Sequence, residues 1–336
     1  MHSALSNAQA KQYLDAVAAH EGLRQLAHHM KEYRGGMHWK AIAGRDYLYR
    51  TTDRRGNARS LGVRSTETEN LYAEFSRRKA ELVERLVAAK EVTRTAERVN
   101  VALRVGAVPN QVANVCRALD DAQLMGRTLM VVGTNAMHAY GYLCGVHFQS
   151  GTMVTTEIDL LGNHKSKLSL AAPEQFSVAE LLGVLHRIDK SYTESRKHRY
   201  RARSSSGFVV DLIRQSPKPP WTQEPDRFFE TNLVASDTCN MDWLLSAPCL
   251  EQPVVAVNGR VFSMSVPDPR AFAAFKGWMS HRNDRCLSKK GRDLAQARAL
   301  ISLLDERLPQ LNNWGALKPV RHQILQQAPA ATAERT

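Results

Sequence analysis

Two acidic residues lie two positions apart in a segment that otherwise suits a buried strand. The segment reads Thr155-Thr156-Glu157-Ile158-Asp159-Leu160-Leu161. Successive side chains of a strand point to opposite faces of its sheet, so Glu157 and Asp159 are expected to project together. Their apolar neighbours Ile158 and Leu160 then face a core. The chain is therefore expected to fold around a sheet that is packed on one face and presents two carboxylates on the other.

A third acid, Asp211, repeats this arrangement in the apolar segment 208–213. Ionised carboxylates are costly to bury, and like charges repel unless a cation joins them. Oxygen ligands that leave room for water suit Mg²⁺ or Mn²⁺, and two such ions can activate a hydroxyl and stabilise a leaving pyrophosphate. We predict that Glu157, Asp159 and Asp211 are metal-binding catalytic residues that hold two ions. The alternative is that they are solvated residues at a sheet edge.

A glycine turn precedes these acids. Gly133-Thr134-Asn135 follows the apolar strand segment Leu129–Val132 and opens a helix expected over residues 135–144. Backbone N–H groups at a helix N-terminus bind anionic phosphate, so Gly133, Thr134 and Asn135 are predicted to bind a nucleotide. The alternative is that Thr134 and Asn135 only cap the helix.

The order of these segments resembles the DNA polymerase β-like nucleotidyltransferase superfamily. Its pattern is a strand ending in Gly-[Gly/Ser], then two acids separated by one apolar residue, then a later Asp. The matching residues are Val131-Val132-Gly133-Thr134, Glu157-Ile158-Asp159 and Asp211. Thr134 stands where Ser is usual, and Glu157 stands where Asp is usual. Segments 36–61, 65–86, 132–141, 156–161, 208–214 and 266–299 look more narrowly like a bacterial nucleotidyltransferase-fold family related to AbiEii-type toxins.

The resemblance also draws attention to Lys276 and Asp293. Lys276 lies among apolar residues of an expected helix, where a flexible ammonium could reach a triphosphate. It matches a motif lysine of the toxin-like relatives, and Asp293 matches an aspartate that orients this lysine or a nucleotide. We assign both residues to nucleotide binding. The alternatives are that Lys276 extends along a buried face and that Asp293 pairs with Lys289.

The resemblance implies an α+β fold in which a mixed-sheet core of the polymerase β type is flanked by helices. Four regions are expected: a mainly helical one with a small β-sheet at about 37–63, the nucleotidyltransferase core, a helical C-terminal region and a tail. Their residues are 1–120, 121–266, 267–312 and 313–336.

Periodicity and turn signals predict the other elements. Helices are expected over 8–34, from a capping box at Thr66-x-x-Glu69 to about residue 100 with one apolar stripe, over about 105–119 and over 177–188. Asn258-Gly259 predicts a type I′ hairpin turn between strands 254–257 and 260–266. Asp268-Pro269 is expected to begin one helix, and Ser288 to cap another that reaches Leu304.

A formal net charge of +13 favours phosphate-bearing partners. One basic run spans residues 187–203. It either forms a solvated loop or binds the backbone of RNA or DNA. Another surface combines Arg45, Arg50, Arg54, Arg55 and Arg59 with Tyr47 and Tyr49, which either bind nucleic acid or belong to the core. No apolar stretch reaches the ~18 residues of a membrane helix, and no secretory signal is evident, so a cytoplasmic protein without membrane contact is expected. The five cysteines contain no C-x-x-C pair, which favours reduced thiols.

The leading hypothesis is a Mg²⁺- or Mn²⁺-dependent nucleotidyltransferase that transfers NMP from an NTP, such as ATP, to a hydroxyl on RNA or protein. The resemblance implies a toxin or defence setting, with a cognate antitoxin or partner protein. The alternative is a catalytically silent nucleotidyltransferase fold that binds nucleic acid. A third possibility is a structural dimer built on residues 66–100.

Overall fold

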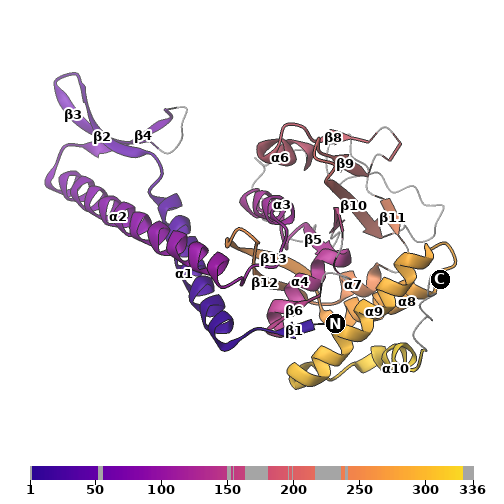
Figure 1. Ribbon diagram of the computed structural model, residues 1–336. Coiled ribbons are helices and arrows are strands. Elements are labelled where there is room, and N and C mark those ends of the chain that lie inside the picture. Colours follow the sequence, from indigo (N-terminus) through magenta and orange to yellow (C-terminus); the bar gives the residue numbers. More distant parts are fainter. Residues whose placement is uncertain are drawn as a thin grey trace. The chain divides into compact units, whose positions relative to one another are not determined.

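The structure is a computed structural model that describes residues 2–51, 56–149, 153, 155–162, 181–195, 197–198, 200–215, 236–238 and 241–327. The chain divides into two compact units (Figure 1). Unit 1 comprises residues 1–10 and 104–336, and unit 2 comprises residues 11–103. Antiparallel and mixed sheets occur together with helices near both ends, which confirms the predicted α+β class. None of the described helices combines the length and the apolarity that a membrane span requires.

Unit 2 contains a three-stranded antiparallel sheet of β2 (Gly36–Ile42), β3 (Arg45–Thr51) and β4 (Ala58–Val63). It also contains most of α1 (Asn7–Glu32) and all of α2 (Thr66–Ala102). The turn between β2 and β3 is Ala43-Gly44, with positive φ at both residues, 49° and 76°. Positive φ at both positions is the type I′ geometry that matches strand twist. The sequence contains no Asn-Gly or Asp-Gly here, so the turn was not predicted.

Helix α2 begins differently from the prediction. Its N-cap is Ser65, whose hydroxyl accepts a hydrogen bond from the Thr68 backbone N–H, while the Thr68 hydroxyl accepts one from the Ser65 N–H. The predicted box at Thr66 and Glu69 is therefore wrong, and Glu69 instead forms an ion pair with Arg64. The observed box Ser65-x-x-Thr68 and the predicted box Thr66-x-x-Glu69 are offset by one residue, and serine is the more favourable N-cap residue.

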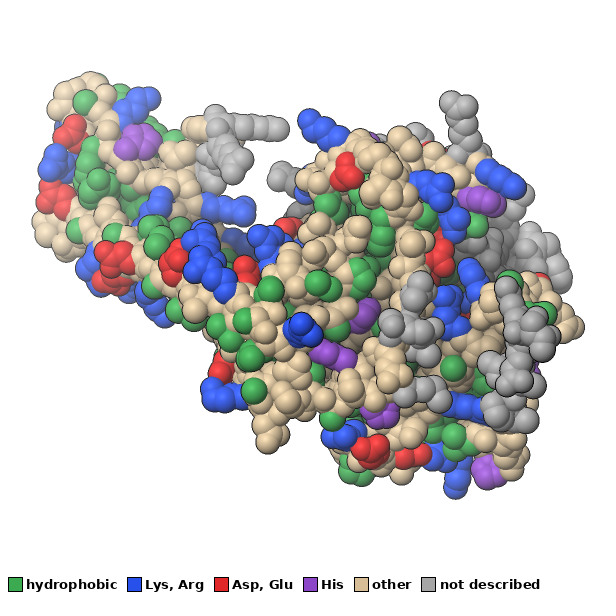
Figure 2. All heavy atoms as spheres, viewed as in Figure 1, with side chains coloured by type: hydrophobic (Ala, Val, Ile, Leu, Met, Phe, Trp, Pro, Cys, Tyr) green, Lys and Arg blue, Asp and Glu red, His purple; other side chains and the backbone are tan. Residues whose placement is uncertain are grey.

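The predicted apolar stripe of α2 is only partly covered. Phe75, Leu82 and Leu86 are half-buried, whereas Leu71 is 42% exposed. Basic, acidic and hydrophobic side chains alternate along the helix (Figure 2). Buried residues on α2 are the polar Thr68, Thr93 and Asn100, and Gln12 of α1 donates a hydrogen bond to the Asn100 side chain. Polar bonds therefore contribute to the packing of α1 on α2.

Unit 1 is built around a mixed sheet. Its strands are β5 (Leu129–Val132), β7 (Glu157–Gly162), β8 (Thr193–Glu194), β9 (Arg201–Arg203), β10 (Val209–Gln215) and β11 (Ser236–Thr238). The order is β5-β7-β10-β9-β8, and β11 pairs with the C-terminal part of β10. The central pair β7 and β10 is parallel, whereas β5, β9 and β8 run antiparallel to their neighbours. Buried Val131, Ile158, Leu160 and Val210 make the sheet part of the core.

Unit 1 also contains helices. They are α3 (Asn110–Asp121), α4 (Gly133–Leu143), α6 (Leu181–Ile188), α7 (Asp242–Ser246), α8 (Pro269–His281), α9 (Leu287–Arg307) and α10 (Lys318–Gln326), with 3₁₀ turns at Pro309–Leu311 and Gly315–Leu317. Of these helices, α4 contacts β5 and β7 of the mixed sheet. Strand β1 (His2–Ala4) pairs with β6 (Val146–Phe148). Helices α8 and α9 lie side by side (Figure 1). Residues 177–180 of the predicted helix and residues 328–336 of the predicted tail lie outside the described residues, whereas α10 lies in the described part of the tail.

The hairpin β12 (Cys249–Val255) and β13 (Val261–Pro267) occurs where Asn258-Gly259 predicts one. Its turn is not type I′, because Gly259 has a positive φ of 86° but Asn258 does not. The Gly259 N–H bonds to the Ala256 carbonyl and the Ala256 N–H bonds to the Arg260 carbonyl, which closes a three-residue loop. Such loops place glycine at the left-handed third position.

The start of α8 is as predicted, and the start of α9 is not. Asp268 accepts the Arg270 N–H and Pro269 occupies the first turn of α8. The N-cap of α9 is Cys286, so the predicted cap Ser288 lies inside the helix. The Ser288 hydroxyl lies 3.3 Å from the Cys286 sulfur.

Candidate functional site

Strand register brings the three predicted acids together. Asp159 on β7 is the direct partner of Asp211 on the parallel strand β10, and Glu157 lies two residues earlier on the same face. On the other side of β7, Asp159 is opposite Val132, the last residue of β5. All three carboxylates therefore lie near the end of β5, where α4 begins.

The glycine at that point is required by close packing. Gly133 has a φ of 67°, and a Cβ added to it would lie 2.0 Å from Oδ2 of Asp159. Any other residue would collide with this carboxylate and would also strain the backbone. The first turn of α4 is consequently held against Asp159.

Thr134 and Asn135 are buried in this first turn and face different partners. The Asn135 side-chain NH₂ donates to the Glu157 carbonyl at 2.7 Å, while its Oδ1 is buried without a hydrogen-bond partner among the described residues. The Gln296 side chain of α9 donates to the Thr134 hydroxyl at 3.3 Å. The N-cap residue of α4 is Val132, and no side chain caps this helix. The capping role considered for Thr134 and Asn135 is therefore wrong.

The acids differ in their electrostatic surroundings. Burial, followed by the negative charges of Glu157 and Asp211, raises the pKa of Asp159 to about 7. The nearby ammonium groups of Lys276 and Lys289 act in the opposite direction. Among the described residues, the attraction of these two ammonium groups does not offset the rise in the pKa of Asp159.

Asp211 has a positively charged partner in Arg201. The sequence identifies Arg201 only as part of the basic run 187–203. Arg201 on β9 is the cross-strand partner of Asp211. Its Nε and Nη2 donate to Oδ1 and Oδ2 of Asp211 at 2.8 and 2.7 Å, and these hydrogen bonds raise the pKa of the guanidinium. Nη2 also lies 3.6 Å from Glu157 Oε2. Arg196 and Arg199 of the same run lie outside the described residues.

Glu157 is shared between two cations. Arg201 approaches one of its oxygens, and the ammonium of Lys289 on α9 lies 3.6 Å from the other. Among the residues that the structure describes, no group of three or more His, Cys, Asp or Glu side chains is gathered to hold one metal ion. The oxygen-only donors suit Mg²⁺ or Mn²⁺, but Arg201 already pairs with Asp211.

Lys276 and Asp293 meet in a buried ion pair between α8 and α9. Lys276 Nζ lies 2.7 Å from Asp293 Oδ1, and Arg285 Nε lies 2.9 Å from Oδ2. The Lys276 residue is 4% exposed and Asp293 is fully buried. Burial lowers the pKa of Lys276, and Asp293 opposes this change. The considered pairing of Asp293 with Lys289 is wrong, because Lys289 approaches Glu157 instead.

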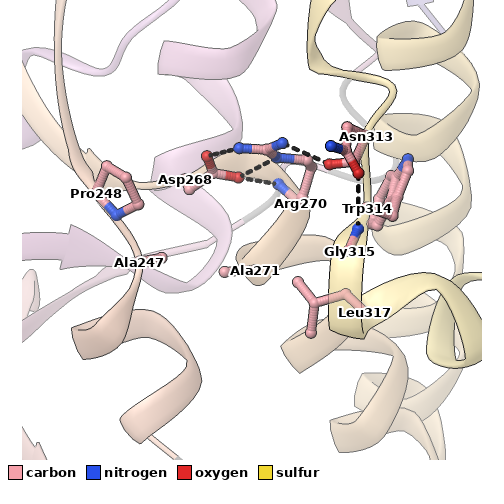
Figure 3. A pocket seen from close by; sticks show the side chains of 9 residues that line it. All are labelled: Ala247, Pro248, Asp268, Arg270, Ala271, Asn313, Trp314, Gly315 and Leu317. Carbon is pink, nitrogen blue, oxygen red and sulfur yellow. Dashed lines mark hydrogen bonds and ion pairs between the residues drawn. The ribbon is translucent and has the colours of Figure 1, made fainter.

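A separate hollow of about 270 Å³ lies where Ala247 and Pro248 approach the start of α8 and the segment Asn313–Leu317. Asp268 and Arg270 form an ion pair in it, and Arg270 donates to the Asn313 carbonyl (Figure 3). None of the predicted site residues lines this hollow.

A family model described as nucleotidyltransferase matches residues 110–316. This range is more than half of the chain and contains the eight predicted site residues. Neither the comparison with curated proteins nor that with solved structures gave a match. Because the family model matches more than half of the chain, the chain belongs to this nucleotidyltransferase family.

Proposed function

We propose that the protein is a metal-dependent nucleotidyltransferase that transfers NMP from an NTP to a hydroxyl on RNA or protein. One observation carries this proposal: Asp159 and Asp211 are in register on adjacent strands, beside Glu157 and against Gly133 at the start of α4. Three carboxylates next to a helix N-terminus combine cation ligands with an anion site.

Glu157, Asp159 and Asp211 are the residues that would hold Mg²⁺ or Mn²⁺. When bound, these ions supply neutralisation of the triphosphate and activation of the acceptor hydroxyl. The high pKa of Asp159 supports the assignment, since a carboxylate that is destabilised by burial and by neighbouring negative charges gains most from an added cation. Asp211 would hold an ion only after release from Arg201, because Arg201 engages both of its oxygens.

The first turn of α4 is the proposed phosphate site. No side chain caps α4, and the backbone N–H groups of this turn, formed by Gly133, Thr134 and Asn135, are the proposed donors to the phosphate. Asn135 also fixes the turn to β7 through the Glu157 carbonyl. Asp293 holds the ammonium of Lys276, which acts electrostatically on Asp159, so we assign Lys276 to phosphate neutralisation and Asp293 to its positioning.

The test is transfer of label from each of four α-³²P-labelled NTPs to RNA or protein in a cell lysate with Mg²⁺ or Mn²⁺. Asp159→Asn should abolish transfer because it removes a ligand charge without changing the size of the side chain. Asp15→Asn is the matched control, since Asp15 is exposed on α1 and pairs only with Lys11 in the described structure. Transfer that persists in Asp159→Asn would refute the assignment.

The second candidate is a silent nucleotidyltransferase fold that binds nucleic acid. The bidentate Arg201–Asp211 pair favours it, because the guanidinium takes the place that a cation requires. This candidate predicts that no label is transferred from any NTP. It also predicts that the protein binds nucleic acid and that Asp159→Asn leaves this binding unchanged. The toxin or defence setting and a cognate antitoxin are supported only by the narrower resemblance of the sequence.

A further inference from the structure

The small sheet of unit 2 has one face covered by α2. Leu48 is fully buried on this face, and the Trp39 ring lies 6.0 Å from that of Tyr72 on α2. The Arg50 guanidinium lies 4.1 Å from the ring of Phe75, also on α2. Trp39, Leu48 and Arg50 share this face because Trp39 is opposite Leu48 in the register and Arg50 is two residues further along β3.

The opposite face, which we call the outer sheet face, carries a different set of side chains. Register and alternation place the following polar and aromatic residues on it: His38, Lys40, Arg45, Tyr47, Tyr49 and Ser60. The exposed apolar residues Ile42 and Val63 lie on the same face. The described residues of β2, β3 and β4 on this face include no Asp or Glu. The only acid of these strands, Asp46, belongs to the other face and pairs with Arg64.

Aromatic rings and cations are interleaved on the outer sheet face. The rings of His38 and Tyr49 stack with centroids 6.0 Å apart and planes 23° apart. Lys40 Nζ lies 5.7 Å from the Tyr49 centroid. His38, Lys40 and Arg45 are exposed, and both tyrosines are only half-buried. Tyr47 and Tyr49 therefore do not belong to the core beneath α2, which argues against one of the two alternatives open at the level of sequence.

This chemistry fits unpaired bases. Partly exposed rings on a sheet offer stacking surfaces, and adjacent cations neutralise the phosphates that join the bases. A second copy of the same face is disfavoured because it presents like charge. Single-stranded segments are also the form in which RNA exposes bases to proteins.

We propose that the outer sheet face binds single-stranded RNA. The choice of RNA rests on the proposed function, in which RNA is one class of acceptor. Arg54 and Arg55, which the sequence also groups with this surface, lie outside the described residues.

The test is fluorescence anisotropy of the full chain with an unstructured RNA of about 12 nucleotides, in EDTA and without NTP. Tyr47→Leu/Tyr49→Leu keeps apolar bulk and should weaken binding at least about tenfold, since stacking on both rings is lost. Tyr47→Phe/Tyr49→Phe retains the rings and should bind within about twofold of the original chain. This conservative pair separates loss of stacking from loss of folding.

The charge test uses Lys40→Glu/Arg45→Glu. Its binding should weaken, and the slope of log Kd against log salt should fall by about 0.7 for each phosphate that the variant no longer neutralises. Arg85→Glu/Lys90→Glu makes the same change in net charge at exposed positions of α2 and should alter affinity less than about threefold.

Equal weakening by both charge pairs, unchanged binding in the leucine variant, or tighter binding to duplex RNA or anionic vesicles would overturn the proposal. Because binding is measured without NTP or metal, it is independent of nucleotidyl transfer. A chain that binds RNA through Tyr47 and Tyr49 but transfers no label would support this inference and contradict the proposed enzyme.

Discussion

Asp159 and Asp211 are direct neighbours in the sheet, yet their environments have opposite effects on stability. The pKa of Asp159 is raised from an ordinary 3.8 to about 7, so the folded protein binds this proton more tightly than the unfolded chain does. As pH rises between these values, the folded state therefore loses stability. Asp159→Asn should increase the free energy of unfolding at about pH 8 by about 1–3 kcal/mol, with a difference near zero at about pH 4.

Urea unfolding at both pH values without divalent metal measures this effect. Asp211→Asn is the matched comparison, because it removes the partner of Arg201 and should destabilise by about 1–3 kcal/mol. Equal destabilisation by both substitutions at about pH 8 would contradict the unpaired state of Asp159.

We expect Arg201 to control how readily the proposed acids accept a cation. Its guanidinium occupies both Asp211 oxygens and approaches Glu157, so a divalent ion must compete with it. Arg201→Gln should bind Mn²⁺ about tenfold more tightly in the absence of nucleotide, which corresponds to about 1.4 kcal/mol. Electron paramagnetic resonance of free Mn²⁺ measures this affinity, with Arg203→Gln on the same strand as the control. An unchanged Mn²⁺ affinity in Arg201→Gln would contradict the expected competition between Arg201 and the cation.

At the scale of elements, the sequence correctly predicted features that depend only on residues close together in the chain. The strand Leu129–Val132 matches β5 because its apolar run ends at a glycine, and Asp268-Pro269 fixes the start of α8. Glu157 and Asp159 could be predicted to share one face of β7 because alternation is a property of each strand alone, whereas their grouping with Asp211 followed from the family resemblance. Their position beside Gly133 also follows the order of the segments.

The cross-strand partner could not be predicted in this way. Arg201 meets Asp211 only because β9 pairs antiparallel with β10, and three residues of β9 carry too weak a strand signal to indicate that pairing. The ion pair of Lys276 and Asp293 likewise depends on how α8 packs on α9. The domain boundaries at residues 120, 266 and 312 remain a prediction.

The packing of α8 on α9 buries the ion pair of Lys276 and Asp293. Removing one charge of this pair and removing both should affect stability differently. Asp293→Asn leaves the Lys276 ammonium buried without its carboxylate, and we expect a loss of about 3–5 kcal/mol in unfolding free energy. Lys276→Met/Asp293→Leu replaces the pair by apolar side chains and should lose less, because the buried ammonium is removed with its carboxylate and only the partly exposed Arg285 loses its partner. A double-mutant cycle in urea measures the coupling. Additive losses would show that the two residues act independently.

At the scale of the whole molecule, the two units differ in how they are stabilised. The described residues of unit 2 include only six that are buried, of which three are polar: Tyr13, Ala16, Leu48, Thr68, Thr93 and Asn100. Unit 1 buries whole strands and helix faces, including Leu129–Val132 and Ala271–Phe275. Apolar burial is the dominant stabilising contribution in folding, so unit 2 is expected to be the less stable unit.

This difference predicts two levels of protection in native-state hydrogen exchange. Amides of β2, β3 and α2 should exchange at lower urea than those of β5, β7 and β10, because local unfolding follows the buried contacts of each unit. Leu48→Ala removes the one large apolar side chain that is fully buried in the described part of the small sheet, and should lower protection there by about 2–5 kcal/mol. Protection of β7 should stay unchanged in this variant. Mass spectrometry of peptides from both units measures the effect, and equal loss in β7 would mean that the units unfold as one.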